Sequence, residues 1–444
     1  MTARNAAVRG IAASLSAALV PCIALAAGES PSVTATLNQL YPELDALYLD
    51  LHRTPELSWH EEKTAAKMAE QLGKIGFEVT TGVGRNGVVG VLKNGAGPTV
   101  MLRTELDALP VEEKTGLPYA SKVTARNDAG ETVSVMHACG HDIHMASWVG
   151  AATILARGKD RWRGTVVMIG QPAEEVVSGA AAMLADGLFT RFPKPDYAIA
   201  VHSLGVLPAG QIGIVPGYAL ANMDTVEITI YGKGGHGAIP HLAVDPIVIG
   251  ARTVLTLQTI VAREVNPLDP AVVTVGSFLG GTKSNIIPAD VKLQLTVRSY
   301  KNEVQKQLLA AIARIAKAEA LAGNAPREPL VVVDPHGTTH STFNNETLIG
   351  RLRPVLAGAF GAANVVDFQR IMASEDFSEY GHAGVPAVLF WIGATEPAKF
   401  ADLKSKGVVP PNNHSPLFSP DRERTIRTGT TTLALSALEL LGNP

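Results

Sequence analysis

The sequence predicts an α/β fold in which a larger domain, built around a mixed β-sheet, carries a smaller inserted α+β domain. Three observations lead to this prediction. Helical and strand-like segments alternate over the first half of the chain, the pattern changes near Gly217 to strictly alternating strands between helices, and the first pattern returns near residue 334. With 444 residues, 46% hydrophobic and 18% charged, the chain has an ordinary globular composition and enough residues for two cores.

The first part of the larger domain is predicted at residues 32–216. Residues 34–57 and 60–77 have apolar positions at helical spacing, and Pro55 and Gly76 are the stop signals expected at their ends. Short runs rich in valine, leucine and isoleucine then predict strands, namely "GVVGVLKN", "PTVMLRTEL", "GTVVMIGQP" and "DYAIAVHS". Strands that alternate with helices indicate a sheet flanked by helices, with the chemistry at the strand ends.

The inserted α+β domain is predicted at residues 217–333. The segments "DTVEITIYGKGG", "AVVTVGSFLGG" and "ADVKLQLTVRSY" alternate between apolar and polar residues, so each predicts a half-buried strand. Residues 245–264 and 301–320 have helical patterns, which gives a β-α-β-β-α order. Residues 334–444 return to the larger domain, with a strand at "AVLFWIG" and a terminal helix at 423–441.

The start of the chain has the pattern of a secretory signal peptide at residues 1–26. Arg4 and Arg9 precede an uncharged apolar stretch, which ends in the small residues of "ALA". A membrane anchor is the alternative, and it is disfavoured because the apolar stretch is short and contains Pro21. No later segment predicts a membrane span. We therefore expect a periplasmic or secreted protein with no membrane contact after cleavage.

Charge and cysteine content narrow the classes of function. The formal net charge is −3, and removing Arg4 and Arg9 would make it −5 with no basic stripe, so nucleic acid is not an expected partner. The same cleavage would remove Cys22 and leave Cys139 as the single cysteine. An unpaired thiol is unusual in an exported protein, and a metal ion bound to its thiolate would explain it. The alternative is a buried, inert cysteine.

The segment "HACGHDIH" at residues 137–144 concentrates side chains that bind metals. An apolar helical pattern begins just after its glycine, so Cys139 and His141 lie at a helix N-terminus, where the helix dipole favours a thiolate. Two ligands one residue apart can reach one metal ion, but they do not complete a site. His137 and His144 fit either as further ligands or as hydrogen-bonding neighbours of the ligands.

Three further segments supply candidate ligands. In "GQPAEEVVSGA" the adjacent Glu174 and Glu175 follow a strand, and there one carboxylate could bind metal while the other acts as a general base for water. His202 ends the run "YAIAVHS", and His414 lies in "NNHSPLF" after two prolines. Either histidine alone would more often be structural. Together with "HACGHDIH", these segments offer enough ligands for two metal ions.

Other catalytic arrangements do not fit the sequence. It has no G-x-S-x-G for a serine hydrolase, "HEEKT" lacks the second histidine of H-E-x-x-H, and "GKGGHG" lacks the Ser or Thr that follows Lys in a P-loop. Metal-assisted hydrolysis accounts for all the segments. A non-catalytic metal or ligand binder is the alternative from another class, and Glu174 argues against it, because such a site has no use for a free carboxylate beside the metal.

Seven segments, in order along the chain, carry a resemblance to a known family: "LHRTPELSWHE", "LRTELDALP", "MHACGHDIHMA", "GQPAEE", "GKGGHGAIPH", "SNIIPADVKL" and "SEDFSEY". By these segments the chain resembles the M20 family of metallopeptidases, and within it the amidohydrolase branch of hippurate hydrolases, N-acyl amino acid amidohydrolases and auxin-conjugate hydrolases. The resemblance implies cleavage of the amide bond of an N-acyl amino acid to a carboxylic acid and a free amino acid. Dipeptidase or carboxypeptidase activity is the alternative within the family.

The resemblance also implies a centre of two divalent metal ions, zinc or manganese, with Glu174 as the general base. The metal ligands that it implies are Cys139, His141, Glu175, His202 and His414. The family pattern R-A-D-M-D-A-L-P appears here as "RTELDALP", so that Glu105 replaces an aspartate while Asp107 is kept. Glu105, Asp107 and Asp142 are expected to contact the ligand side chains rather than the metal ions, and so to hold the ligands in position.

The inserted domain resembles the lid and dimerisation domain of the family, which makes a homodimer through this domain possible. His236, in "GKGGHG", would help to stabilise the tetrahedral oxyanion, and Asn285 and Arg298 would contact polar groups of the substrate. Arg298 continues an alternating strand and points to the face opposite Leu293 and Leu295. An arginine on that face would bind the free carboxylate of a small N-acyl amino acid or short peptide.

Overall fold

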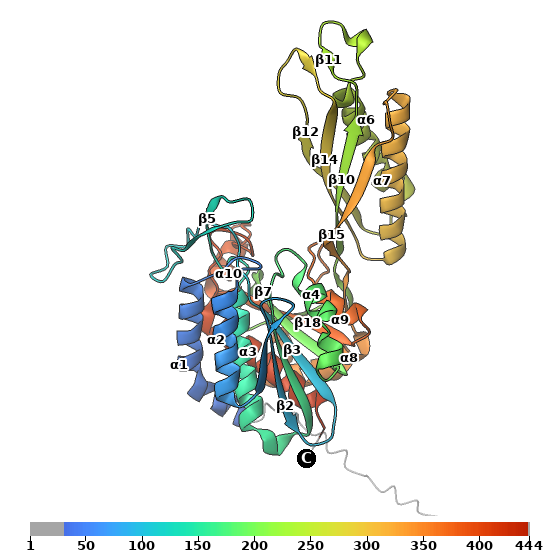
Figure 1. The fold of residues 1–444 in the computed structure, drawn as a ribbon. Coiled ribbons are helices and arrows are strands. Elements are labelled where there is room, and N and C mark those ends of the chain that lie inside the picture. The colour runs from blue at the N-terminus through green and yellow to red at the C-terminus, as the bar shows by residue number, and fades with distance from the viewer. Residues whose placement is uncertain (1–30, 443–444) are drawn as a thin grey trace, which may run out of the picture.

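The computed structural model describes residues 31–442, so the signal peptide predicted at residues 1–26 lies outside the described part. Figure 1 shows a larger α/β domain from which a smaller, elongated domain projects. The predicted fold class is confirmed, because a mixed sheet forms the larger domain and a separate antiparallel sheet forms the inserted one. Within the described residues, no helix has the length and apolar character needed to cross a membrane.

The central sheet of the larger domain has eight strands in the order β1-β2-β6-β3-β7-β18-β8-β17. They are β1 (Glu78–Val83), β2 (Gly87–Asn94), β3 (Thr99–Glu105), β6 (Gly164–Gln171), β7 (Tyr197–Pro208), β8 (Ile212–Ile214), β17 (Val365–Asp367) and β18 (Ala387–Thr395). The four central strands β6, β3, β7 and β18 run parallel, and β1, β2 and β8 add antiparallel pairs. Continuous burial along β3 and β18 follows from helices on both faces of the sheet.

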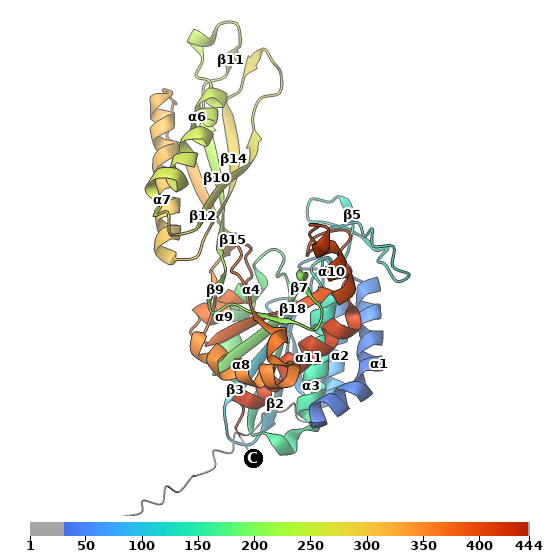
Figure 2. The same cartoon turned by 180° about the vertical axis from the view of Figure 1, so that it is seen from behind.

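Helices cover the two faces of this sheet in two separate hydrophobic layers (Figures 1 and 2). One face carries α1 (Pro31–Arg53), α2 (Glu62–Ile75), α3 (His141–Arg157), α8 (Glu346–Phe360) and α11 (Arg422–Leu440). The other face carries α4 (Gly179–Ala185), α5 (Leu188–Arg191) and α9 (Ser378–His382). Near the rim lie α10 (Pro397–Ser405) and the hairpin of β4 (Thr124–Arg126) and β5 (Thr132–Ser134).

The smaller domain is an antiparallel sheet in the order β12-β14-β10-β15, covered by two helices. Its elements are β10 (Asn222–Tyr231), α6 (Pro246–Thr259), β12 (Ala271–Leu279), β14 (Asp290–Ser299), α7 (Asn302–Ala322) and β15 (Leu330–Thr339). Two short strands, β11 (Gly235–His236) and β13 (Ile286–Ile287), pair at the end farthest from the larger domain. We call this unit, residues 222–339, the lid.

The ends of the lid differ from the predicted 217–333. β9 (Gly217–Leu220) pairs with β16 (Thr342–Asn344), so the chain on both sides of the lid is held together at its base. β15 continues to Thr339 and adds a strand to the expected β-α-β-β-α order. Most of its residues are exposed because it is the edge strand of the sheet, and this explains why its sequence lacks the alternation of a half-buried strand.

Candidate metal centre and active site

The candidate ligands lie close together at the end of the central sheet that faces the lid, not at an edge strand. Cys139 precedes α3 and His141 begins it, Glu175 lies in the loop after β6, and His202 lies on β7. The loop before α11 brings His414 to the same place. Four of the five predicted ligands, all but His141, line one cavity of about 400 Å³ together with Glu174 and Arg298.

The ring nitrogens of His141 and His202 are arranged as metal binding requires. Nδ1 of His141 lies 2.8 Å from the backbone oxygen of Asp107, and Nδ1 of His202 lies 2.8 Å from that of Ser203. A carbonyl oxygen only accepts, so each Nδ1 carries a hydrogen, and in the neutral imidazole, the form that binds a metal, each Nε2 then keeps its lone pair. Nε2 of His141 is buried without a hydrogen-bond partner, and Nε2 of His202 lies 3.4 Å from the sulfur of Cys139. Both lone pairs are therefore available to a cation.

The remaining donors form two overlapping groups. Ligand atoms of Cys139, Glu175 and His414 lie within 4.8 Å of one another, and so do those of His141, Glu174 and Glu175. Oε2 of Glu175 is 3.3 Å from Nε2 of His414, while its Oε1 is buried without a partner. Because the groups share Glu175, this mixed set of sulfur, nitrogen and oxygen donors can hold two neighbouring divalent metal ions.

Charge in the cluster points to the same conclusion. Burial raises the pKa of Glu174 well above its usual range, and the neighbouring Glu375 and Glu175 add to the effect. Burial likewise raises the pKa of Glu175 to about 8, and it raises the pKa of the Cys139 thiol. These shifts arise because several acidic groups share a site with little water. A bound dication supplies the missing positive charge and favours the thiolate and carboxylate forms.

Local backbone structure places the ligands. Gly140 has a φ of 86°, and a Cβ at this position would lie 2.4 Å from Oγ of Ser203, so the turn between Cys139 and His141 needs glycine. His414 also has a positive φ, of 68°, and its backbone N–H donates to the oxygen of Ala138 over 2.8 Å. Strain of this kind in a non-glycine residue is common where function fixes a side chain.

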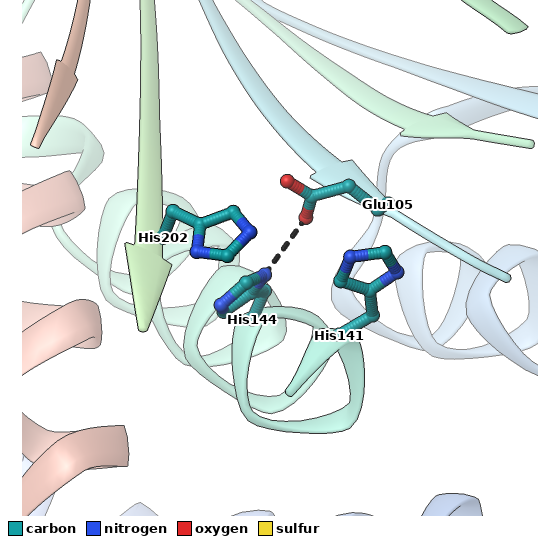
Figure 3. A group of neighbouring side chains, drawn as sticks. All are labelled: Glu105, His141, His144 and His202. Carbon is teal, nitrogen blue, oxygen red and sulfur yellow. Dashed lines mark hydrogen bonds and ion pairs between the residues drawn. The ribbon is translucent and has the colours of Figure 1, made fainter. Parts of the chain in front are cut away.

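Asp107 and Glu105 occupy different positions behind the ligands. Oδ2 of Asp107 accepts hydrogen bonds from the backbone N–H of Glu175 (2.9 Å) and from Ser58 (2.7 Å), so Asp107 supports the glutamate loop and His141 together. Glu105 contacts His144 instead, with Oε2 3.0 Å from Nδ1 (Figure 3). Asp142 turns away from the cluster and lies 2.7 Å from Nδ1 of His52.

The structure separates the two histidines whose roles the sequence left open. His144 uses both ring nitrogens within the protein, since Nδ1 donates to Glu105 and Nε2 accepts the backbone N–H of Ser203 over 2.7 Å. It lies beside His141 and His202 in Figure 3 and holds Glu105 in place. His137 is buried with neither ring nitrogen hydrogen-bonded, and burial lowers its pKa to about 4, so it is a neutral residue.

The sequence predicted a role for Glu105 but none for its buried partners Arg103, Glu375 and Asp376, which form an ionic network beside the cavity. Nη2 of Arg103 lies 2.8 Å from Oε1 of Glu375 and 3.0 Å from Oδ1 of Asp376, and Nη1 pairs with Glu105. The guanidinium is fully buried. The residues of this network lie in two of the segments that carry the family resemblance, "LRTELDALP" and "SEDFSEY", but the acidic residues of "SEDFSEY" have the composition of an exposed surface.

The three lid residues of the predicted site fall into two places. Arg298 on β14 lines the cavity, and its Nη1 donates to the backbone oxygen of Met372 over 2.9 Å. His236 lies on β11, and the backbone oxygen of Asn285 accepts the N–H of Gly237 beside it over 2.8 Å. The side chains of His236 and Asn285 are exposed. Figure 1 shows β11 at the end of the lid farthest from the larger domain, so this chain does not bring these residues to its own metal centre.

The fold and the site indicate a class of protein, a metal-dependent hydrolase, because a buried glutamate, Glu174, lies beside the candidate metal ligands. Residues 101–405, more than half of the chain, match the family described as peptidase family M20/M25/M40. The chain belongs to this family, whose members hydrolyse C–N bonds.

Relatives along nearly the whole chain support this placement. The chain is 34% identical to thermostable carboxypeptidase 1 of Saccharolobus solfataricus, over 88% of this chain and 93% of that protein. It is 36% identical to hippurate hydrolase of Campylobacter jejuni, over 76% and 85%. The crystal structure of Bacillus subtilis YXEP, described as a dinuclear metal binding peptidase from the M20 family, superposes with a TM-score of 0.71 at 28% identity, over 91% of this chain and 100% of that one.

Proposed function

We propose that this protein is an amidohydrolase that cleaves N-acyl amino acids to a carboxylic acid and a free amino acid. The observation that carries the proposal is the position of Arg298, a guanidinium in the wall of the same cavity that holds the metal ligands. A carboxylate bound there would place the adjacent amide near the ligands. The rest of the wall includes apolar side chains that suit an acyl group, namely Val177, Leu204, Leu220, Met223, Ile371 and Trp391.

A carboxypeptidase or dipeptidase is the second candidate, because Arg298 would bind the carboxylate of a peptide C-terminus equally well. Relatives named for each activity occur at similar identity, 34% for the carboxypeptidase and 36% for the hippurate hydrolase. The size of the cavity, about 400 Å³, favours the smaller conjugates.

The proposed reaction assigns a separate task to each residue. Cys139, His141, Glu175, His202 and His414 would hold two divalent ions, which we propose to be zinc or manganese, and such ions would polarise the amide carbonyl and lower the pKa of the attacking water. Glu174, only 6% exposed, takes the proton from that water. As the C–N bond breaks, Glu174 passes the proton to the leaving nitrogen, which gives one carboxylic acid and one amine. The raised proton affinity of the buried Glu174 suits a group that must accept and then return a proton.

We also propose a homodimer through the lid. His236 and Asn285 lie exposed at the end of the lid farthest from their own metal centre. In a dimer they could instead contribute to the metal centre of the second subunit. Apolar side chains on α6 support this, since Leu255 and Val248 are 72% and 57% exposed.

The signal peptide pattern at residues 1–26 leads us to propose a periplasmic or secreted location for the mature protein.

The test is a substrate panel with the purified, metal-loaded protein. The panel contains N-acyl amino acids with aliphatic and aromatic acyl groups, the corresponding amino acid amides, and dipeptides. The proposal expects N-acyl amino acids to give the highest kcat/KM and a chelator to abolish it. Preferred cleavage of dipeptides would select the second candidate, and activity that survives complete metal removal would exclude both.

A further inference from the structure

The residue that carries a further inference is Glu375, which forms part of the cavity wall beside Glu174. It is 1% exposed, and its two carboxylate oxygens have different surroundings. Oε1 accepts hydrogen bonds from Nη2 of Arg103 (2.8 Å) and from the backbone N–H of Phe377 (3.0 Å). Oε2 is buried without a hydrogen-bond partner. A buried carboxylate oxygen with no partner is costly unless a ligand supplies one.

The distance between Glu375 and Glu174 suggests what that ligand is. A carboxylate oxygen from each lies within 4.8 Å of the other. Since a hydrogen bond to nitrogen spans about 2.9 Å, one nitrogen atom can lie within reach of both residues. In the proposed reaction, Glu174 delivers a proton to the leaving nitrogen, so that nitrogen must lie beside Glu174. Its own N–H then needs a neighbouring acceptor, and Glu375, whose Oε2 is free, lies within that distance of Glu174.

A metal ion is a poorer occupant of this position. Asp376, the third acidic residue of the group, has both oxygens engaged, since Oδ1 accepts from Gln171 and Arg103 and Oδ2 accepts from the backbone N–H of Ala180. The fully buried guanidinium of Arg103 would also repel a third cation. An N–H donor needs only one free acceptor, and Glu375 provides it.

We propose that Oε2 of Glu375 binds the N–H of the scissile amide and thereby directs the lone pair of the leaving nitrogen toward Glu174. This inference rests on the proposed function, and it makes Glu375 the residue by which the site favours amides over esters. When water has added to the carbonyl, the nitrogen becomes pyramidal, and the direction of its lone pair decides whether Glu174 can protonate it. A hydrogen bond that holds the N–H fixes that direction. An ester has an oxygen in place of the N–H and gains nothing from Glu375.

The experiment compares an amide with its ester in the parent and in Glu375→Gln. The substrates are one N-acyl amino acid and the O-acyl 2-hydroxy acid of the same shape. Glutamine can keep its oxygen toward Arg103 and Phe377 and place an NH₂ group where Oε2 was, so the buried network is disturbed little. The expected result is a fall in kcat/KM for the amide of about tenfold to a hundredfold, as for the loss of a charged hydrogen bond. The value for the ester should fall much less.

Asp376→Asn is the matched control, because Asp376 is as deeply buried and contacts the same Arg103 but does not line the cavity. It should leave the ratio of amide to ester hydrolysis at the parent value. Equal losses for amide and ester in Glu375→Gln, or the same change of ratio in the control, would overturn the inference and make Glu375 structural. If the glutamine variant does not fold, Glu375→Asp carries the same expectation, since it withdraws the carboxylate by one methylene. A parent that cleaves neither substrate refutes the proposed function, and the inference with it.

Discussion

Glu174 and Glu175 are neighbours in one loop, yet their surroundings differ. Oε2 of Glu175 lies 3.3 Å from Nε2 of His414, whereas Glu174 lies in a group of carboxylates with Glu375 and Asp376. We therefore expect Glu174→Gln to lower kcat by a factor of roughly 10² to 10⁴, as for loss of a general base. The metal content of this variant should stay at the parent value. Glu175→Gln should release metal as well, because it weakens a ligand. Elemental analysis beside the rate measurement decides this, and equal metal loss in both variants would mean that the roles are wrongly divided.

Arg298 is the residue for which substrate charge gives the clearest test. If its guanidinium binds the free carboxylate, Arg298→Ala should lower kcat/KM for an N-acyl amino acid by about tenfold to a hundredfold, and much less for the uncharged amide of the same amino acid. Lys292→Ala is the control, since Lys292 lies on the same strand but pairs with Glu227 on the surface. An acid-to-amide ratio that stays at the parent value in Arg298→Ala would show that another group selects the carboxylate.

At the residue scale, the sequence indicated those site residues whose signal is local. Cys139 and His141 stand one residue apart at a helix start, and Glu174 and Glu175 are adjacent, so short patterns identified them. Glu375 could not be identified in this way. Its significance depends on Arg103, 272 residues away, which ties down one oxygen and leaves the other free. Only the folded chain shows that an acidic run is buried against a guanidinium.

At the scale of elements, the loop from Pro172 to Ser178 decides where Glu174 and Glu175 point. Ala173 has a φ of 51°, and its backbone N–H donates to Oε1 of Glu61 over 2.8 Å. The same oxygen accepts the N–H of Trp59, and Oε2 accepts from Asn86. Glu61 is fully buried just before α2, so one side chain joins the start of that helix to the loop.

We expect Glu61→Ala to disturb both stability and the site. It leaves the buried N–H of Ala173 and the partly buried N–H of Trp59 without an acceptor, at a cost of about 1 to 3 kcal/mol for the buried one, and it frees Ala173 to leave its strained conformation. Urea unfolding should show the loss of stability, and metal analysis should show weaker binding. Glu62→Ala, at the neighbouring exposed position, should change neither. Full stability and metal content in Glu61→Ala would show that the loop holds its shape without this contact.

Helices and strands that bury one face could be predicted from the sequence, because burial leaves a periodic pattern of apolar residues. Elements that bury few side chains could not. β14 alternates between buried and exposed residues, as its sequence predicted. α2 ends before Gly76, which has the φ of 99° that suits glycine as a helix stop. β15 escaped prediction because an edge strand that buries few side chains carries no alternation, and its run includes Pro335 and Gly337.

At the scale of the whole molecule, a cluster around His52 joins the two ends of the larger domain. Nδ1 of His52 on α1 lies 2.7 Å from Asp142 on α3, and Nε2 lies 3.2 Å from Glu113 in the loop after β3. Arg422, at the start of the terminal helix, lies over the ring of Tyr119, which contacts His52 edge-on. His52 therefore joins the first helix to the helix that carries His141 directly, and to the last helix through Tyr119.

The charge on this histidine predicts how the stability of the molecule varies with pH. Burial lowers the pKa of His52, but hydrogen bonds to Asp142 and Glu113 outweigh burial and raise the pKa to about 9. An unfolded histidine titrates near 6.5. Because the folded pKa is the higher one, the stabilisation is complete below about pH 6.5 and is lost as the pH rises through about 9. The urea midpoint of the parent should therefore fall between pH 6.5 and 9.5.

His52→Gln tests this, because the amide NH₂ of glutamine can still donate to a carboxylate but cannot carry the charge. Its urea midpoint should be lower than that of the parent at pH 6.5, and the difference should shrink as the pH approaches 9.5. His60→Gln is the matched control, since His60 also pairs with an aspartate, Asp128, but both side chains are largely exposed, so its pH profile should follow the parent. A difference between parent and His52→Gln that stays constant over this range would mean that His52 is neutral in the folded protein and joins the three helices by packing and neutral hydrogen bonds alone.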